Sequence, residues 1–186
     1  YVEDAGGLTL DQISAIVWEY KRKHAIEIVY IDYLQLMTAN KERGKSREQE
    51  VSEISRGLKL LAKSAKLPIV VLAQLSRAVE SRGGDKRPLL SDLRESGAVE
   101  QDADIVSFLY RPEYYGIMAD ENGANLRGVT EYIVAKHRNG PIATLYRRFA
   151  FPFTDFVEVN NDYEPVQTVY DPTIVRPSAA DDDIPF

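Results

Sequence analysis

Residues 28–37 read IVYIDYLQLM, an apolar and largely β-branched run that stops at the carboxylate of Asp32. A continuous apolar run of this kind predicts a strand that is buried on both faces of a parallel sheet. In open α/β sheets ligands bind beyond the carboxyl ends of the strands, so an acid there suits a metal ion or a water at a nucleotide site. A second interpretation stays open, in which Asp32 only caps the turn that follows.

The composition is that of a soluble globular protein. The 186 residues are enough for one domain, and 44% of them are hydrophobic and 28% charged. No apolar run approaches the roughly 18 residues of a membrane span, and no signal peptide opens the sequence. The absence of cysteine excludes disulfides and thiolate metal sites, and the two histidines argue against a His-rich metal site. These features predict a cytoplasmic protein with no membrane contact.

The charges are distributed unevenly along the sequence. The net charge of −6 argues at first against a nucleic-acid partner. However, residues 41–47 carry four basic side chains against one acid, and residues 82–94 carry four against two. Basic loops on an acidic body can still bind phosphates. The net charge therefore excludes nothing here.

Two amphipathic helices are predicted in the first third of the sequence. One spans residues 9–24 and starts with the capping-box pair Thr9 and Gln12. Residues 38–47 have no periodicity and are expected to form a basic loop. The other helix spans residues 48–66 and carries an apolar stripe of Val51, Ile54, Leu58, Leu61 and Ala65.

The second helix connects two apolar strands. The first spans residues 27–32, and the second begins after Pro68 with IVVLA and ends on Gln74. A strand, a crossover helix and a strand of this spacing predict a right-handed parallel unit. Polar residues thus follow both strands at one edge of the predicted sheet.

The second half of the sequence predicts one more buried strand and a hairpin. Residues 104–110 (DIVSFLY) are again apolar, and the long polar segment 76–104 precedes them. We expect that segment to be a functional loop with a short helix that starts at Ser91. Residues 129–149 alternate in polarity around the turn RNGP and predict an antiparallel hairpin at the sheet edge. From Asn160 onward the composition predicts disorder.

Four segments stand out together: IDYLQLM (31–37), VVLAQLSRAVESR (70–82), DKRPLLSDLRESGAVEQDADIVSFLYR (85–111) and AKHRNGP (135–141). In this order and spacing they resemble the C-terminal motor domain of bacterial replicative DNA helicases of the DnaB family. The resemblance covers residues 1–156 and leaves residues 157–186 as a flexible acidic C-terminal tail. It implies an α/β fold with a RecA-like, mostly parallel sheet that is flanked by helices and ends in an antiparallel edge hairpin.

The resemblance also implies a function. The protein would be an ATP-dependent replicative DNA helicase that uses ATP and Mg²⁺, translocates on single-stranded DNA as a homohexameric ring and unwinds duplex at the replication fork. Primase and a helicase loader are the further partners that the family implies. The protein would act in the cytoplasm, in association with the nucleoid.

Two residues match the family's nucleotide-binding motifs. Asp32 matches the Walker B aspartate, which holds the water shell of the Mg²⁺ that bridges the β- and γ-phosphates. Gln74 resembles the sensor of the γ-phosphate, which couples the nucleotide state to the DNA loops. Taken without the resemblance, Gln74 would be a strand-end amide that satisfies backbone groups.

The hairpin segment matches a motif that acts across a subunit interface. Lys136, Arg138 and Gly140 fit the family pattern KxRxG, with His137 in place of the usual glutamine. The resemblance implies that Arg138 is an arginine finger, directed with Lys136 at the γ-phosphate of a neighbouring subunit. Such a contact requires a head-to-tail interface that closes into a ring. Otherwise the two cations would be solvated surface residues.

Arg94, Glu95 and Gly97 match the family's DNA-binding loop, in which an arginine and backbone amides hold successive phosphates of single-stranded DNA. A glycine suits such a loop because the backbone can approach a phosphate closely. The alternative is a surface ion pair between Arg94 and Glu95 in a turn. A second loop of the family's central channel is matched only loosely by Lys41, Arg43, Lys45 and Arg47.

The sequence lacks the phosphate-binding pattern G-x-x-x-x-G-K-[ST]. In the family this loop, the catalytic glutamate and the N-terminal domain all lie upstream. Because the sequence also opens at Tyr1 without methionine, we expect a fragment that lacks the central first strand of the sheet. Such a fragment would neither bind ATP normally nor hydrolyse it.

The last six residues, DDDIPF, resemble the acidic tip of bacterial single-stranded-DNA-binding proteins. They suggest docking onto replication proteins, although acidic C-termini also serve as solubilising tails. The residues concerned are Asp181, Asp182, Asp183, Ile184, Pro185 and Phe186.

Two other functions remain open at this point. A RecA-type recombinase or related ATPase would also have residues like Asp32 and Gln74, but it would not be expected to carry DLRESGAVEQDAD together with KHRNG. A degenerate interaction module, retained for its loops or its tail, would need no catalysis. Sequence upstream of Tyr1 would distinguish them.

Overall fold

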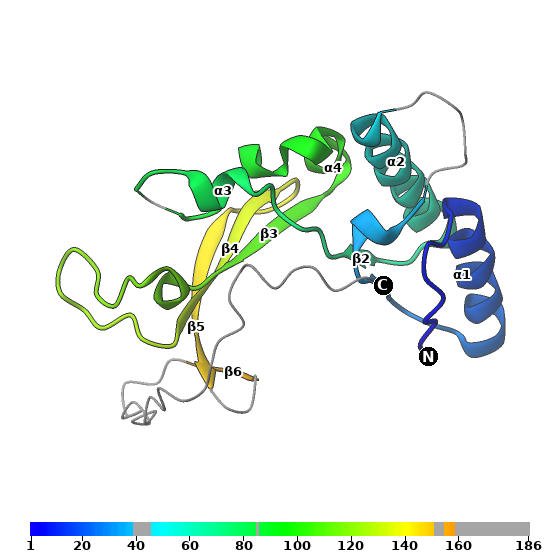
Figure 1. Ribbon diagram of the computed structural model, residues 1–186. Coiled ribbons are helices and arrows are strands. Elements are labelled where there is room, and N and C mark those ends of the chain that lie inside the picture. Colours follow the sequence, from blue (N-terminus) through cyan, green and yellow to red (C-terminus); the bar gives the residue numbers. More distant parts are fainter. Residues whose placement is uncertain (39–45, 85, 151–154, 159–186) are drawn as a thin grey trace.

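The computed structural model describes residues 1–38, 46–84, 86–150 and 155–158. These residues form two sheets (Figure 1). Helices α1 (Leu10–His24) and α2 (Arg47–Ala65) lie beside a two-stranded sheet. A four-stranded sheet forms the second part of the chain.

Both predicted helices are present, and both begin at capping boxes. The Thr9 hydroxyl accepts from the Gln12 amide at 3.4 Å, and the Gln12 side chain accepts from the Thr9 amide at 2.8 Å. Ser46 and Gln49 cap α2 in the same way. A cap is worth about 1 kcal/mol because it satisfies N–H groups that the helix leaves unpaired. It explains why α2 begins at Arg47, one residue before the predicted start.

Strands β1 (Val29–Ile31) and β2 (Ile69–Val71) pair in parallel, with α2 as the crossover between them. This confirms the predicted parallel unit. The residues of the predicted stripe on α2 are all buried, in a core that α1 also enters through Ile13 and Val17. Packing of this stripe holds the helices against one face of the sheet.

The prediction that these strands are buried on both faces is wrong. Val29 and Ile31 pack against the core, but Tyr30 between them is 70% exposed. On β2 and just after it, Val70 and Leu72 are 40% and 53% exposed. Side chains of a strand alternate between the two faces of a sheet. Among the described residues, α1 and α2 cover only one of these faces.

The second sheet is antiparallel throughout, in the order β3 (Ile105–Tyr110), β4 (Val129–His137), β5 (Ala143–Ala150) and β6 (Asp155–Glu158). The predicted hairpin is β4–β5, but it does not lie at the sheet edge because β6 pairs with β5. The expectation of one mostly parallel sheet is wrong for the described residues, since β3 pairs with β4 and not with β2. On β3, Val106, Phe108 and Tyr110 are buried in alternation, as in a half-buried antiparallel strand.

The segment between the sheets contains α3 (Ala78–Ser81), η2 (Leu90–Ser96) and α4 (Gly97–Asp102). The helix predicted to start at Ser91 corresponds to η2 and α4. Leu93 holds η2 in a second core with side chains of β3 and β4. Two short turns, η1 (Leu34–Leu36) and η3 (Pro112–Tyr115), complete the described elements.

None of the helices in the described part of the chain is both long and apolar enough to span a bilayer. The disorder predicted from Asn160 falls outside the described residues, as does nearly all of the tail assigned to residues 157–186.

Gly57 lets α1 and α2 approach closely, because a Cβ at this position would lie 2.0 Å from Cδ2 of Leu10. We expect Gly57→Ala to lower the free energy of unfolding by about 1–3 kcal/mol through overpacking, although alanine is the better helix former by about 1 kcal/mol. In a Leu10→Ala background the clash is absent, so the same change should raise the free energy of unfolding. Urea unfolding followed by circular dichroism measures both effects. Equal effects in the two backgrounds would contradict the contact.

Candidate nucleotide site and nucleic-acid interface

The parallel pairing of β1 and β2 brings Asp32 and Gln74 to the same edge of the sheet. Asp32 follows β1 directly, Gln74 lies three residues beyond β2, and both are exposed. Backbone bonds continue past the strands: the Leu72 amide donates to the Ile31 carbonyl at 2.9 Å, and the Leu34 amide donates to the Leu72 carbonyl at 2.8 Å. The structure therefore brings together the two residues that match nucleotide-binding motifs.

Gln35, which the sequence reasoning missed, connects the two strand ends directly. Its side-chain amide donates to the Gln74 carbonyl at 3.0 Å, and its side-chain oxygen accepts from the Gln74 amide at 3.2 Å. Both backbone groups of Gln74 are thus held by one side chain. The only signal in the sequence is a polar residue between two leucines, three positions after Asp32.

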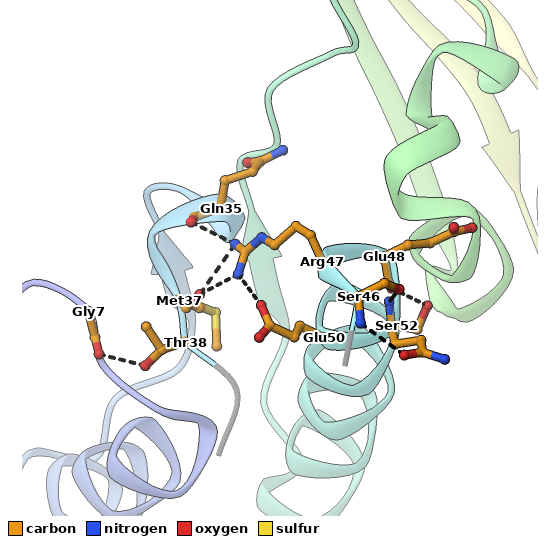
Figure 2. A network of polar contacts seen from close by, with 10 residues as sticks. Gly7, Gln35, Met37, Thr38, Ser46, Arg47, Glu48, Glu50 and Ser52 are labelled. Atoms are coloured by element: carbon orange, nitrogen blue, oxygen red, sulfur yellow. Dashed lines mark hydrogen bonds and ion pairs between the residues drawn. The ribbon is translucent and has the colours of Figure 1, made fainter. Parts of the chain in front are cut away.

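Arg47, the first residue of α2, forms hydrogen bonds with the segment that follows β1 (Figure 2). Its guanidinium donates to the Gln35 carbonyl at 2.8 Å and to the Met37 carbonyl at 3.4 Å, and it pairs with Glu50 at 2.8 Å. These contacts engage the side chain within the chain itself, which does not favour the loosely matched DNA contact. The other three members of that basic group, Lys41, Arg43 and Lys45, lie outside the described residues.

The chain beyond Gln74 is attached to the base of the predicted DNA loop. The Ser76 amide donates to the Asp92 carbonyl at 3.1 Å. The side chain of Asp92 is buried, forms an ion pair with Arg82 and accepts from the Leu89 amide at 2.7 Å. Asp92 therefore organises the start of η2 through both its backbone and its side chain.

Three residues after Asp92 match the DNA-binding loop of the family. Arg94 and Glu95 lie in η2, but their side chains are outside what the structure describes. Gly97 begins α4 in a right-handed conformation and is exposed, and a Cβ there would meet no atom within 4 Å. No steric constraint within the described residues therefore requires a glycine at this position.

Lys136 and Arg138 lie at the end of β4 and reach the last carbonyls of α4. Lys136 donates to the carbonyls of Glu100 and Gln101, the second at 3.2 Å, and Arg138 donates to the Gln101 carbonyl at 3.3 Å. A helix C-terminus attracts cations because its carbonyls carry partial negative charge. The two cations therefore share one attachment at the end of α4, while the side chain of Arg138 stays 51% exposed.

Gly140 is covered by the side chain of His137 in the motif. A Cβ at Gly140 would lie 2.3 Å from Cε1 of the His137 ring, which folds over the turn with Nδ1 3.3 Å from the Pro141 carbonyl oxygen. The histidine that replaces the usual glutamine thus occupies the space above the turn. The His137 ring does not interfere with the hydrogen bonds from Lys136 and Arg138 to the carbonyls of α4.

Asp104, which lies between α4 and β3, joins residues of two further elements. It forms an ion pair with Lys59 of α2, and its second oxygen lies 3.7 Å from Nε of Arg138. The Arg138 amide also donates to the Asp104 carbonyl at 2.8 Å. The hydrogen bond from Lys59 is the main reason why the pKa of Asp104 is lowered, against a smaller opposing effect of desolvation.

Comparison with known proteins gives one family. Residues 1–158 match the family model of the DnaB-like helicase C terminal domain. The replicative DNA helicase DnaB of Geobacillus stearothermophilus is 42% identical over 167 residues, which are 90% of this chain and 36% of that protein. The chain therefore spans about a third of that curated relative.

Two solved structures are similar in fold at the same level of identity. One, described as an ATPase domain, has a TM-score of 0.74 at 42% identity, over 83% of this chain and 52% of that chain. A DnaB-like replicative helicase, described with its interactions with primase, has a TM-score of 0.73 at 42% identity, over 83% of this chain and 36% of that chain. These neighbours show the RecA-like α/β fold.

The ion pair of Asp104 gives the fold a dependence on pH at the acid end. Because the folded pKa lies below the ordinary value of 3.8, the pair stabilises fully above that value, and its contribution is lost as the pH falls through the lowered pKa. We expect Asp104→Asn to lower the midpoint of urea unfolding slightly at neutral pH, since the side chain is 55% exposed. This difference should disappear below the folded pKa. Glu121→Gln, on an exposed loop, is the control, and a difference that persists in acid would contradict the assignment.

Proposed function

This chain belongs to the family of DnaB-like helicase C-terminal domains, and on that premise we propose that it forms the C-terminal part of the motor of a replicative DNA helicase. The motor hydrolyses ATP and translocates on single-stranded DNA as a homohexameric ring, unwinding the duplex at the fork. One observation carries the proposal, a series of contacts within the chain. Gln35 holds Gln74, and two residues later the Ser76 amide bonds to Asp92 at the base of the proposed DNA loop. The helix α4, which follows this loop, is contacted by Arg138.

Asp32 is assigned to the magnesium side of the nucleotide. Mg²⁺ usually keeps several waters and takes one or two protein carboxylates together with phosphate oxygens. Within the described ranges no group of three or more histidine or acidic residues could hold a metal by itself. A single exposed carboxylate beyond a parallel strand fits an ion that arrives with the nucleotide. Asp32 would hold such an ion through its water shell, and the ion would supply neutralisation of the phosphate charge.

Gln74 is assigned to the γ-phosphate. Its backbone is fixed by Gln35, so its exposed side chain projects from a defined point of the edge. An amide can donate a hydrogen bond to a phosphate oxygen and lose it when the phosphate leaves. Because the Ser76 amide is hydrogen-bonded to the Asp92 carbonyl, a displacement of this segment would be transmitted to the proposed DNA loop.

Arg138 and Lys136 are assigned to the nucleotide of a neighbouring subunit. The side chain of Arg138 is 51% exposed while it touches α4, so it remains accessible to a partner. A finger in trans stabilises the charge that develops on the transferred phosphoryl group. This role makes the ring a catalytic requirement, because each site is completed by the next subunit.

Arg94, Glu95 and Gly97 are assigned to single-stranded DNA. The exposed glycine at the start of α4, with no atom near its Cβ position, supports close approach of the backbone to a phosphate. The loop is attached through Asp92 to the segment of Gln74 and through α4 to Arg138. DNA and nucleotide would thus act on the same short stretch of chain.

A further strand is proposed to lie between the two sheets. β2 pairs only with β1, and β3 pairs only with β4, among the described residues. Apolar side chains nearby stay exposed, including Val70 at 40% and Leu109 at 62%. A central strand carrying the phosphate loop, contributed by the rest of the helicase, would pair with both edges and merge them into one sheet.

Primase and a helicase loader are proposed as partners of the complete helicase. The primase interaction is in the description of the similar DnaB-like helicase structure. The docking role of Asp181–Phe186 concerns residues outside the described ranges and remains a prediction. The site of action that we propose is the nucleoid within the cytoplasm.

Arg138→Ala in the complete helicase should leave ATP binding intact and lower hydrolysis by about 10³–10⁵-fold, the usual contribution of an arginine finger. Asp32→Asn should be inactive for a different reason, the loss of the carboxylate assigned to the metal. Because the two defects lie on opposite sides of an interface, mixed rings should regain part of the activity. Steady-state ATPase assays at several mixing ratios measure this. A lack of complementation would exclude a site in trans, and an inactive unmodified helicase would favour the interaction module.

Arg94→Ala should weaken binding of single-stranded DNA to a similar extent for all sequences, because a phosphate contact carries no base information. The plot of log K against log salt concentration should become shallower by about 0.7. Fluorescence anisotropy with a labelled oligonucleotide measures both quantities. Arg127→Ala, which removes the same charge from an exposed position before β4, is the matched control. An unchanged slope for Arg94→Ala would remove this residue from the interface.

A further inference from the structure

We propose that Gln35 is a positioning residue of the motor, which holds the backbone of Gln74 at a fixed place relative to Asp32. The contact is between the Gln35 side-chain amide and both backbone groups of Gln74. The inference rests on the proposed function, because it concerns how the residues assigned to the nucleotide are held. The contact between Gln35 and Gln74 can be tested separately from the catalytic role.

The paired contact takes the place of strand pairing where the strands have ended. β2 stops at Val71, so Gln74 has left the ladder. A primary amide offers one donor and one acceptor side by side, and it can therefore satisfy the N–H and C=O of the same residue. With both groups engaged, the Gln74 backbone is restrained and the direction of its side chain is set.

Gln35 is itself held on two sides, so it can act as a fixed point. The preceding residue, Leu34, is only 1% exposed, and its amide donates to the Leu72 carbonyl. The carbonyl of Gln35 accepts from Arg47, which Glu50 orients in turn. In Figure 2 the Gln35 side chain extends away from Arg47, so its backbone and side chain serve different partners.

The charge of the side chain provides a sensitive test. In Gln35→Glu the carboxylate can still accept from the Gln74 amide, but it faces the Gln74 carbonyl without a proton to donate. A protonated glutamic acid restores that donor in nearly the same shape. The hydrogen bond to the neutral form also raises the pKa of the introduced glutamate. The defect of this variant should therefore be reversed by acid, which a general loss of folding would not show.

The experiment uses the complete helicase on single-stranded DNA and measures kcat and KM for ATP across pH, each relative to the unmodified protein. Gln35→Glu should lower kcat by up to about tenfold at neutral pH, the rate equivalent of one ordinary hydrogen bond, and change the KM for ATP by less than about twofold. The kcat ratio should recover as the pH falls. Gln35→Ala, which removes both hydrogen bonds to Gln74, should show at least as large a loss, without recovery.

A control and a second measurement separate positioning from stability. Gln12→Glu makes the same substitution in the capping box of α1, where glutamate is equally suitable, and should leave the profile unchanged. Amide hydrogen exchange followed by mass spectrometry, in peptides that contain Gln74, should be faster in Gln35→Ala at neutral pH. Unchanged exchange, or faster exchange with unchanged kcat, would overturn the inference.

Failure of the proposed function would look different. An unmodified helicase without DNA-stimulated ATPase activity would overturn both that function and the catalytic part of this inference. The exchange measurement would still decide whether Gln35 fixes Gln74. A kcat loss in Gln35→Glu that does not recover in acid would overturn the role of the paired contact while leaving the proposed function intact.

Discussion

The parallel register of β1 and β2 is the constraint on which the remaining arrangement depends. Val29 pairs with Ile69 and Ile31 with Val71, so both chains leave the sheet at the same edge. α2 connects the strands and buries its apolar stripe against their inner face, and each fully buried aliphatic side chain is worth about 1.5–3 kcal/mol. A slip of one residue would turn the inner face of a strand outward. Packing far from the edge therefore determines which residues meet there.

The sequence predicted what short-range chemistry controls. Capping boxes, the apolar stripe of α2 and the turn RNGP act between residues a few positions apart, and each gave the correct element. The sequence could not show whether one face or both faces of β1 are covered by other elements, because an apolar run is compatible with either arrangement. The role of Asp32 was likewise open from its pattern alone, and its assignment came from the family motifs.

The contacts that the sequence did not reveal join residues far apart in the chain. Gln35 and Gln74 are 39 positions apart, and an amide between leucines gives no local sign of its partner. A basic run indicates phosphate binding, yet Arg47 in that run uses its donors on carbonyls of the chain itself. Charge patterns report how many donors a segment has. They do not report which acceptors the fold places beside them.

The contacts of Lys136 and Arg138 with α4 are compatible with a role in trans. Their partners are carbonyls at a helix end and, for Arg138, also the Asp104 carboxylate at 3.7 Å. A phosphate group adds its own negative charge and can accept two parallel bonds from one guanidinium, which a single carbonyl cannot. In the proposed role, a nucleotide of a neighbouring subunit would compete with these partners for Arg138, while Lys136 would still hold the end of α4.

α4 is the least buried part of this connection. It has six residues, none of which is buried, whereas η1 is held by Leu34 and η2 by Leu93 and Asp92. Val99 is partly buried and packs against the core that contains the α2 stripe. The other attachments are polar: Ser55 donates to Asp102 at 3.0 Å, and Lys136 and Arg138 donate to the last carbonyls of α4. Local stability is lowest where few side chains are buried, and α4 lies between the proposed DNA loop and the residue assigned to the neighbouring subunit.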